Sequence, residues 1–169
     1  MIHASSSGET SSLEDRVRRL EDAEGVLRTL YQYAEGLDYG PLELFLDCFT
    51  ETATWEGIRI DLAPEARPQR LFQGVAELTR YFHEPIRSRA PDRYFKHLLV
   101  EPRISIEDDE ARVTSYFVRI QEHRDGPYIH AFGRYRDLLT RCDDGRWRLQ
   151  ERRAEIEAFQ DRWAPAPSG

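Results

Sequence analysis

The chain has 169 residues, of which 40% are hydrophobic and 33% charged, and its formal net charge is −7. This size and composition predict one globular domain with a hydrophobic core of its own. The acidic balance argues against general binding to nucleic acid or to an anionic membrane, because both partners require a basic face. The two cysteines, Cys48 and Cys142, match no metal-ligand spacing, so neither a disulfide framework nor a zinc site is expected.

The two ends of the chain are polar and carry no pattern of regular structure. Residues 1–12 lack the apolar stretch of a secretory signal, and residues 161–169 contain two prolines. Both segments are expected to be flexible tails, and a single domain is expected over residues 13–160. No apolar run approaches the length of a membrane-spanning segment, so the expected location is the cytoplasm.

Helical patterns dominate the first half of the sequence. Apolar residues at helical spacing predict a long helix that starts after Ser12, with Asp15 completing a capping box, and ends between Asp38 and Pro41. Further along, the patterns predict a short helix over residues 42–49, a strand over 50–60, a loop over 61–69 and a third helix over 75–82.

Strand patterns dominate the second half. Four segments rich in β-branched and aromatic residues cover residues 94–106, 111–121, 128–140 and 147–159. The short polar connections between them favour antiparallel hairpins. Helices followed by such a meander predict an α+β domain, in which N-terminal helices pack on a strongly curved, mainly antiparallel sheet. A sheet of this kind encloses a pocket suited to one small, largely apolar molecule.

Several segments, in this order and spacing, resemble the SnoaL-like domains of the nuclear-transport-factor-two-like superfamily. They are residues 30–38, 49–55, 96–100, 133–137 and 144–147. The resemblance covers roughly residues 13–159 and implies a cone-shaped fold, usually dimeric or trimeric, around an interior pocket. The superfamily includes scytalone dehydratase, lindane dehydrochlorinase, bile-acid dehydratase, ketosteroid isomerase and polyketide cyclases. It also includes non-catalytic oxygenase subunits, so the fold alone does not fix a function.

Asp38 and His97 match the catalytic pair of the dehydratase and dehydrochlorinase branch. There, an aspartate at the end of the first helix orients a histidine on the first long strand. A neutral imidazole can remove a proton beside a leaving group or a carbonyl, and the carboxylate fixes its tautomer and stabilises the imidazolium that forms. The residues alone favour a turn residue at Asp38 and a core histidine at His97, and it is the resemblance that favours the catalytic pair.

Tyr33 and Arg152 are two further catalytic candidates. They match a tyrosine of the bile-acid dehydratase and a catalytic arginine of the dehydrochlorinase, and each would stabilise a developing negative charge. The alternatives are a core tyrosine and a surface arginine paired with a carboxylate. Tyr33 and Asp38 lie roughly 140° apart on an ideal helix, so both are expected to face one pocket only if the helix unwinds at Asp38. Ile156 replaces the arginine that the bile-acid dehydratase uses, which argues against a steroid substrate.

Six other side chains are expected to line the pocket, although each could instead belong to the core. They are Trp55, Phe95, Leu99, Tyr116, Phe132 and Arg134. Arg153, next to Arg152, is expected to face the opposite side of its strand. His83, His123 and His130 are expected to be structural or at the surface. No histidine and carboxylate grouping has metal-ligand spacing and no glycine-rich loop suits a phosphate, so neither a metal nor a cofactor is expected.

Three functions remain open from the sequence. The first is a cofactor-independent lyase or isomerase, of the dehydratase, isomerase or polyketide-cyclase type, that acts on a small cyclic substrate and works as a homodimer or homotrimer. The second is a non-catalytic ligand-binding or assembly subunit, such as an oxygenase small subunit. The third is epoxide hydrolysis, which requires a water molecule held by a paired aspartate and arginine.

Overall fold

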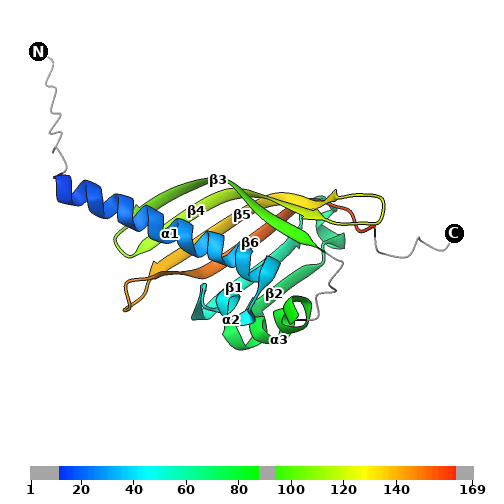
Figure 1. Ribbon diagram of the computed structural model, residues 1–169, viewed down its shortest axis with the longest axis horizontal. Coiled ribbons are helices and arrows are strands. Elements are labelled where there is room, and N and C mark those ends of the chain that lie inside the picture. Colours follow the sequence, from blue (N-terminus) through cyan, green and yellow to red (C-terminus); the bar gives the residue numbers. More distant parts are fainter. Residues whose placement is uncertain (1–11, 88–93, 163–169) are drawn as a thin grey trace, which may run out of the picture.

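A long N-terminal helix crosses one face of a strongly curved sheet (Figure 1). The computed structural model describes residues 12–87 and 94–162. The helices are α1 (Leu13–Tyr39), α2 (Leu42–Leu46) and α3 (Gly74–Arg87), with a 3-10 turn at Pro64–Ala66. The expected α+β architecture is confirmed. The tails expected at residues 1–12 and 161–169 lie outside the described residues, apart from positions 12, 161 and 162.

The sheet has six strands in the order β2-β1-β6-β5-β4-β3. They are β1 (Phe49–Arg59), β2 (Gln69–Gln73), β3 (Phe95–Glu107), β4 (Glu110–Gln121), β5 (Tyr128–Arg141) and β6 (Trp147–Phe159). The last four form the expected antiparallel meander, and β1 joins it by pairing parallel to β6. The sequence analysis missed β2, because its five residues show no alternation of polar and apolar side chains.

Helix α1 has the start that its sequence predicts. The Ser12 hydroxyl accepts a bond from the backbone N–H of Asp15 (3.1 Å), and the Asp15 carboxylate accepts one from the backbone N–H of Ser12 (3.3 Å). The helix ends at Gly40, whose φ of 66° lies in the left-handed region that glycine adopts readily. It remains helical through Asp38, so the unwinding considered above does not occur.

Close packing of α2 against the end of α1 fixes this corner of the fold. A side chain at Gly36 would lie 2.7 Å from the backbone of Phe45, so only glycine allows this approach. Phe45 is fully buried and packs against the ring of Tyr33, with 5.2 Å between ring centroids. The last turn of α1 is therefore held rigidly over β3, with which it makes extensive contact.

Strand β4 shows which face of the sheet is covered. Its buried residues alternate strictly with exposed ones, and they are Ala111, Val113, Ser115 and Phe117. The buried face packs on the helices and on the core, and the other face is open to solvent. The concave side of the sheet thus holds both the core and any interior site.

Candidate active site

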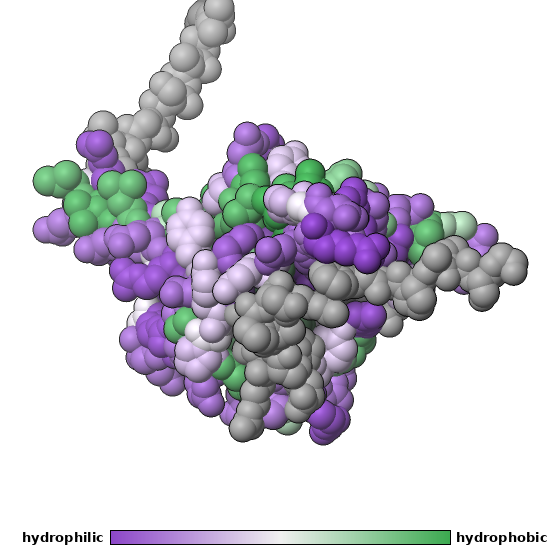
Figure 2. Space-filling model, turned by 45° about the vertical axis from the view of Figure 1, so that its right-hand side comes forward, coloured by the Kyte–Doolittle hydropathy of each residue, from purple (hydrophilic) through white to green (hydrophobic). Residues whose placement is uncertain are grey.

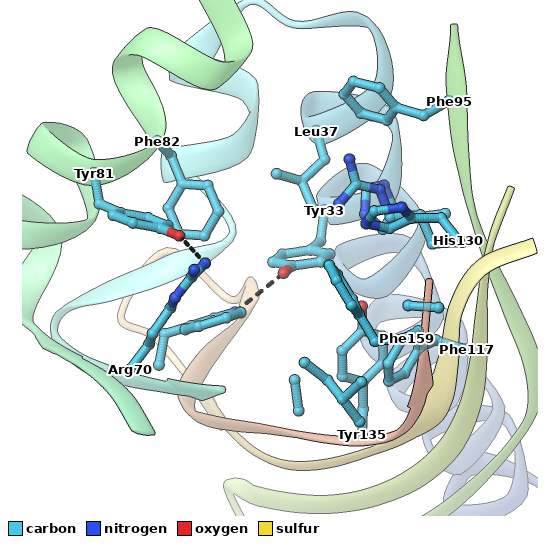
Figure 3. A pocket seen from close by; sticks show the side chains of 16 residues that line it. Tyr33, Leu37, Arg70, Tyr81, Phe82, Phe95, Phe117, His130, Tyr135 and Phe159 are labelled. Carbon is cyan, nitrogen blue, oxygen red and sulfur yellow. Dashed lines mark hydrogen bonds between the residues drawn. The ribbon is translucent and has the colours of Figure 1, made fainter. Parts of the chain in front are cut away.

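A cavity of about 300 Å³ opens on the concave side of the sheet (Figure 3). This volume lies at the lower end of the range for small-molecule pockets. The wall is mainly aromatic and aliphatic, with two arginines and two histidines. The lining residues are Tyr33, Leu37, Trp55, Arg70, Tyr81, Phe82, Phe95, His97, Phe117, Arg119, His130, Ala131, Tyr135, Ala154, Ile156 and Phe159.

Asp38 and His97 meet at the wall of this cavity. The Oδ1 atom of Asp38 lies 2.6 Å from Nδ1 of His97, and its Oδ2 atom accepts the backbone N–H of His97 at 2.9 Å. Both carboxylate oxygens are therefore used to hold one residue. His97 lines the cavity whereas Asp38 lies behind it, which leaves Nε2 of His97 as the nitrogen available to a guest.

Burial sets the protonation state of His97. It lowers the pKa of the imidazole below its ordinary value, and Asp38 opposes this effect without cancelling it. The positive charge of Arg119 lowers the pKa of His97 further. At neutral pH the imidazole is therefore uncharged, which is the form that can accept a proton.

Tyr33 projects from a different face of α1 than Asp38 and forms part of the cavity wall. Its hydroxyl oxygen accepts a bond from Nε1 of Trp55 (3.1 Å), so its own proton remains available to a guest (Figure 3). Tyr33 and Asp38 face different directions from a regular helix. Both serve the site nevertheless, because Asp38 reaches it through His97.

Arg152 does not line the cavity, contrary to its expected place there. It faces inward while Arg153 faces outward toward Glu56, as strand alternation requires. Its side chain is 1% exposed and donates from Nε and Nη2 to the two oxygens of Asp137, at 2.9 and 2.7 Å. Asp137 lies directly opposite on β5 and so takes up the guanidinium before a guest can.

Two tyrosine rings separate Arg152 from the cavity. The guanidinium carbon lies 3.9 Å from the ring centre of Tyr33 and 4.2 Å from that of Tyr135. Both rings belong to the cavity wall. Arg152 therefore supports the wall from behind, through a buried ion pair and two cation–π contacts.

The predicted lining residues divide into three groups. Trp55 and Phe95 line the cavity as predicted. Leu99 shares the face of His97 but packs against the core instead. The prediction was wrong for three residues on the outer face of β4 and β5, namely Tyr116 (47% exposed), Phe132 (43% exposed) and Arg134, which pairs with Glu155 at 2.5 Å.

The alternation of side chains along β4 explains why these residues point away from the cavity. Tyr116 and Arg134 are direct partners across β4 and β5, and partners point to the same face. The buried residues of β4 are the odd-numbered ones, so the even-numbered Tyr116 points to solvent together with Arg134. The alternation itself was visible in the sequence, but the choice of the inner face was not.

The sequence analysis missed His130, which it treated as structural or at the surface. Arg119 pairs with Ala131 and Ile120 pairs with Ile129, so His130 is the extra residue of a β-bulge. The bulge turns both His130 and Ala131 inward, and His130 is 5% exposed on the cavity wall. Burial, and next the charge of Arg119, lower the pKa of His130 to about 4. No sequence pattern marks this bulge.

Arg119 was also missed, although a signal for it exists. The inward-facing series of β4 runs through Val113, Ser115 and Phe117, and Arg119 is its next member. Its guanidinium lies 5.0 Å from the ring centre of Phe95. Its Nε is buried, and no described residue accepts a hydrogen bond from it. An arginine two places beyond a buried phenylalanine on an alternating strand predicts a cation on the inner face.

Neither a metal-binding cluster nor a membrane-spanning helix is found among the described residues. No group of three histidine, cysteine or carboxylate side chains there is placed to hold a metal ion. In the same part of the chain, no helix is long and apolar enough to cross a membrane.

Comparison with known proteins places this geometry in context. A family model described as a SnoaL-like domain matches residues 18–153. A search of curated proteins gave no match.

Solved structures match over most of the chain. An NTF2-like protein with a cystatin-like fold from Novosphingobium aromaticivorans matches with a TM-score of 0.72 and 20% identity, over 89% of this chain and 92% of that one. The beta subunit of a proposed aromatic-ring-hydroxylating dioxygenase from the same organism matches with a TM-score of 0.70 and 19% identity (85% and 94%). ActVI-ORFA from Streptomyces coelicolor matches with a TM-score of 0.66 and 19% identity (81% and 98%). At these identities the likeness establishes the fold alone.

Proposed function

We propose a cofactor-independent proton-transfer function for this chain, which belongs to the family of SnoaL-like domains. The reaction is of the lyase or isomerase class, with dehydration, isomerisation and polyketide-type cyclisation as its members. One observation carries the proposal: a neutral histidine on the wall of an apolar cavity is held by a buried carboxylate on its far nitrogen.

His97 is the general base of this proposal. Its Nε2 removes a proton from a carbon atom of the guest, and the imidazole becomes an imidazolium. Asp38 holds Nδ1–H at 2.6 Å, which keeps the proton on that nitrogen and stabilises the positive charge that develops. The second bond, from the backbone N–H of His97 to Oδ2, keeps the carboxylate from rotating away.

The cavity wall indicates the class of substrate. Aromatic side chains from α1, β1 and α3 surround the space, and Ile156 contributes a further apolar surface. The substrate is therefore a small, largely apolar cyclic molecule with an acidic C–H bond. Tyr33 supplies a proton donor on the same wall, and burial raises the pKa of its hydroxyl, which keeps it protonated.

Deuterium exchange tests the proposal without knowledge of the natural substrate. In D₂O, NMR would follow the loss of α-protons from a panel of cyclic ketones that includes 2-tetralone. The wild-type protein should exchange at least one ketone faster than buffer does, and His97→Gln should lose roughly 10²- to 10⁴-fold of that rate. His123→Gln, a histidine outside the cavity, is the matched control and should keep the full rate. Equal rates for wild type and His97→Gln on every ketone would contradict the proposal.

The second candidate is a non-catalytic subunit. The fold shared with the dioxygenase beta subunit supports it, and the organised contact between Asp38 and His97 supports the enzyme instead. A subunit of this kind would show no exchange above buffer and would bind a partner polypeptide, so the same assay separates the two candidates.

Exposed apolar side chains support association of the chain with copies of itself. The outer face of β3, β4 and β5 exposes Leu98, Val100, Tyr116, Ile129 and Phe132. Apolar side chains are also exposed at the N-terminal end of α1 (Figure 2), where Leu13 and Leu20 are each 72% exposed. We expect a homodimer or homotrimer, and light scattering coupled to size-exclusion chromatography would give the number of copies. A monomer at micromolar concentration would contradict this part of the proposal.

A further inference from the structure

The cavity wall carries a cation, Arg119, that has no carboxylate among the residues lining the cavity, although Asp38 and Asp161 lie near enough to interact with its charge. Arg119 lines the wall, its Nε is buried, and none of the described residues accepts a hydrogen bond from that atom. The lining residues of the cavity include no aspartate and no glutamate. Arg119 is half-buried, and an arginine withdrawn from water in this way normally pairs with a carboxylate, because leaving its charge unpaired is costly. A cation without a carboxylate partner on the cavity wall indicates a ligand that brings a negative charge to it.

Arg119 lies beside the catalytic candidate His97. The two residues are direct partners across β3 and β4, so their side chains leave the sheet on the same face. The ring of Phe95 contacts both, at 5.0 Å from the guanidinium carbon of Arg119 and 5.6 Å from the centre of the His97 ring. A guest that reaches Nε2 of His97 therefore also lies close to the guanidinium.

Among the described residues, Arg119 is the arginine of the cavity wall that lies beside His97. Arg152 is paired through Nε and Nη2 with both oxygens of Asp137 and lies behind the wall. Arg70 donates to the hydroxyl of Tyr81 at the far side of the cavity (Figure 3). His130, next to Arg119, is uncharged at neutral pH. Arg119 is thus the cation available to an anion that lies beside His97.

We propose that Arg119 is the oxyanion-binding group of this cavity, and that its ligand is a small aromatic molecule bearing one negative oxygen beside His97. The carboxylate of a bound acid and the enolate of a ketone share this chemistry. A guanidinium suits both, because it stays charged at all accessible pH values and presents several donors in one plane. The binding part of this inference stands alone, and the catalytic part rests on the proposed function.

The catalytic step is the enolisation of a ketone, in which His97 is the base and Arg119 stabilises the enolate oxygen. Nε2 of His97 takes the proton from the carbon next to a carbonyl, and the C–H electron pair forms a C=C bond. The carbonyl π pair moves to oxygen, and Arg119 donates hydrogen bonds to the enolate oxygen. In a ketone that carries a C=C bond between the β and γ carbons, the oxygen pair re-forms the carbonyl, the enolate C=C pair moves to the bond between the α and β carbons, and the original C=C pair takes the proton of the imidazolium at the γ carbon. This regenerates the neutral base and gives an isomer. No oxidant or reductant enters the balance.

Binding of a matched pair of probes tests the assignment directly. The two probes are 2-naphthoate, an anion, and 2-naphthamide, a neutral molecule of similar shape, and calorimetry would measure both affinities. The wild-type protein should prefer the naphthoate by about 10- to 100-fold, as expected for charge-assisted hydrogen bonds. Arg119→Gln should abolish the preference, and Arg119→Lys should keep part of it.

The control variant removes an arginine from the other face of the same strand. Arg112 is exposed, with its partner Glu110 at 3.6 Å, and Arg112→Gln should keep the full preference. Circular dichroism and thermal unfolding would show that each variant is folded. The inference fails if Arg119→Gln keeps the preference, if Arg112→Gln loses it equally, or if the wild-type protein binds the amide as tightly or binds neither probe.

Two comparisons of ketone exchange with naphthoate binding complete the test. One distinguishes failure of the oxyanion site from failure of the proposed base, and the other distinguishes a carboxylate ligand from an enolate. If ketone exchange persists in His97→Gln while Arg119→Gln loses naphthoate, the proposed base is wrong and the oxyanion site stands. If Arg119→Gln keeps the full exchange rate of wild type but loses naphthoate, the ligand is a carboxylate and the enolate role is refuted.

Discussion

Arg119 and Arg152 face the same concave side of the sheet, yet their surroundings differ completely. Arg152 is held by both oxygens of Asp137 and lies under two tyrosine rings, whereas Arg119 borders the cavity with a buried Nε that no described residue engages. The comparison shows how one residue type is divided between two roles. A cation paired with a buried carboxylate stabilises the wall of the site, and we infer that a cation on the cavity wall without such a partner among the lining residues is kept for a guest.

The largest effect should come from breaking the satisfied pair. Arg152→Met leaves the Asp137 carboxylate buried without a partner, which should lower the free energy of unfolding by about 3–5 kcal/mol. Urea denaturation would measure this. The double variant Arg152→Met with Asp137→Leu removes both charges and should recover most of the loss. A loss below 1 kcal/mol in the single variant would show that the pair is not structural.

The next effect concerns the pair that holds the base. Asp38→Asn keeps the shape of the site but no longer stabilises the imidazolium, so ketone exchange should fall by roughly 10²-fold or more. Asp38 raises the pKa of His97, and its removal should shift the acid limb of the rate profile to lower pH. A pH–rate profile of both proteins measures the two changes together. An unchanged limb would contradict the role given to Asp38.

A smaller effect should appear in the pH dependence of stability. The pKa of His130 is lowered to about 4 in the folded protein, against about 6.5 when unfolded, so the unfolded state binds more protons between these values. The contribution of His130 to the free energy of unfolding is fully present above about pH 6.5 and is lost as the pH falls toward 4. His130→Gln should reduce that acid loss by about 2 kcal/mol in urea denaturation at several pH values. The same acid loss in both proteins would refute the effect.

The smallest effect concerns the unsatisfied arginine itself. Replacing Arg119 by methionine removes a desolvated cation from an apolar wall, so the free energy of unfolding should rise by about 1 kcal/mol without ligand. NMR titration should also show a higher pKa for His130 in this variant, because Arg119 is one of the causes that lower it. Destabilisation by Arg119→Met would mean that the side chain has a structural partner after all, and the comparison with Arg152 would then fail.

The sequence was sufficient for the architecture, and the family resemblance identified Asp38 and His97 as a candidate pair. Helix α1 and the four strands of the meander were predicted to within a few residues, because long amphipathic patterns and capping residues carry strong local signals. Asp38 and His97 were identified by resemblance, and they are 59 residues apart in the chain. Their meeting depends on how α1 packs across β3, which no local pattern encodes.

The remaining residues of the site depend on face and register. Tyr116, Phe132 and Arg134 were assigned to the wrong face and Arg119 was overlooked on the inner one, because alternation along β4 shows which residues share a face but not which face is the inner one. His130 was not available, because a one-residue bulge reverses which side chains turn inward. Arg152 was expected to face inward, and it does. The sequence does not show that Asp137 lies opposite on β5 and pairs with Arg152, which keeps its guanidinium out of the cavity.

Deuterium incorporation into 2-tetralone and its companion ketones, measured for wild type and His97→Gln side by side, tests the assignment of the base most directly. The account predicts exchange that the wild-type protein accelerates above buffer and that the variant loses while it remains folded. A folded His97→Gln protein that exchanges the ketone as fast as wild type would contradict it.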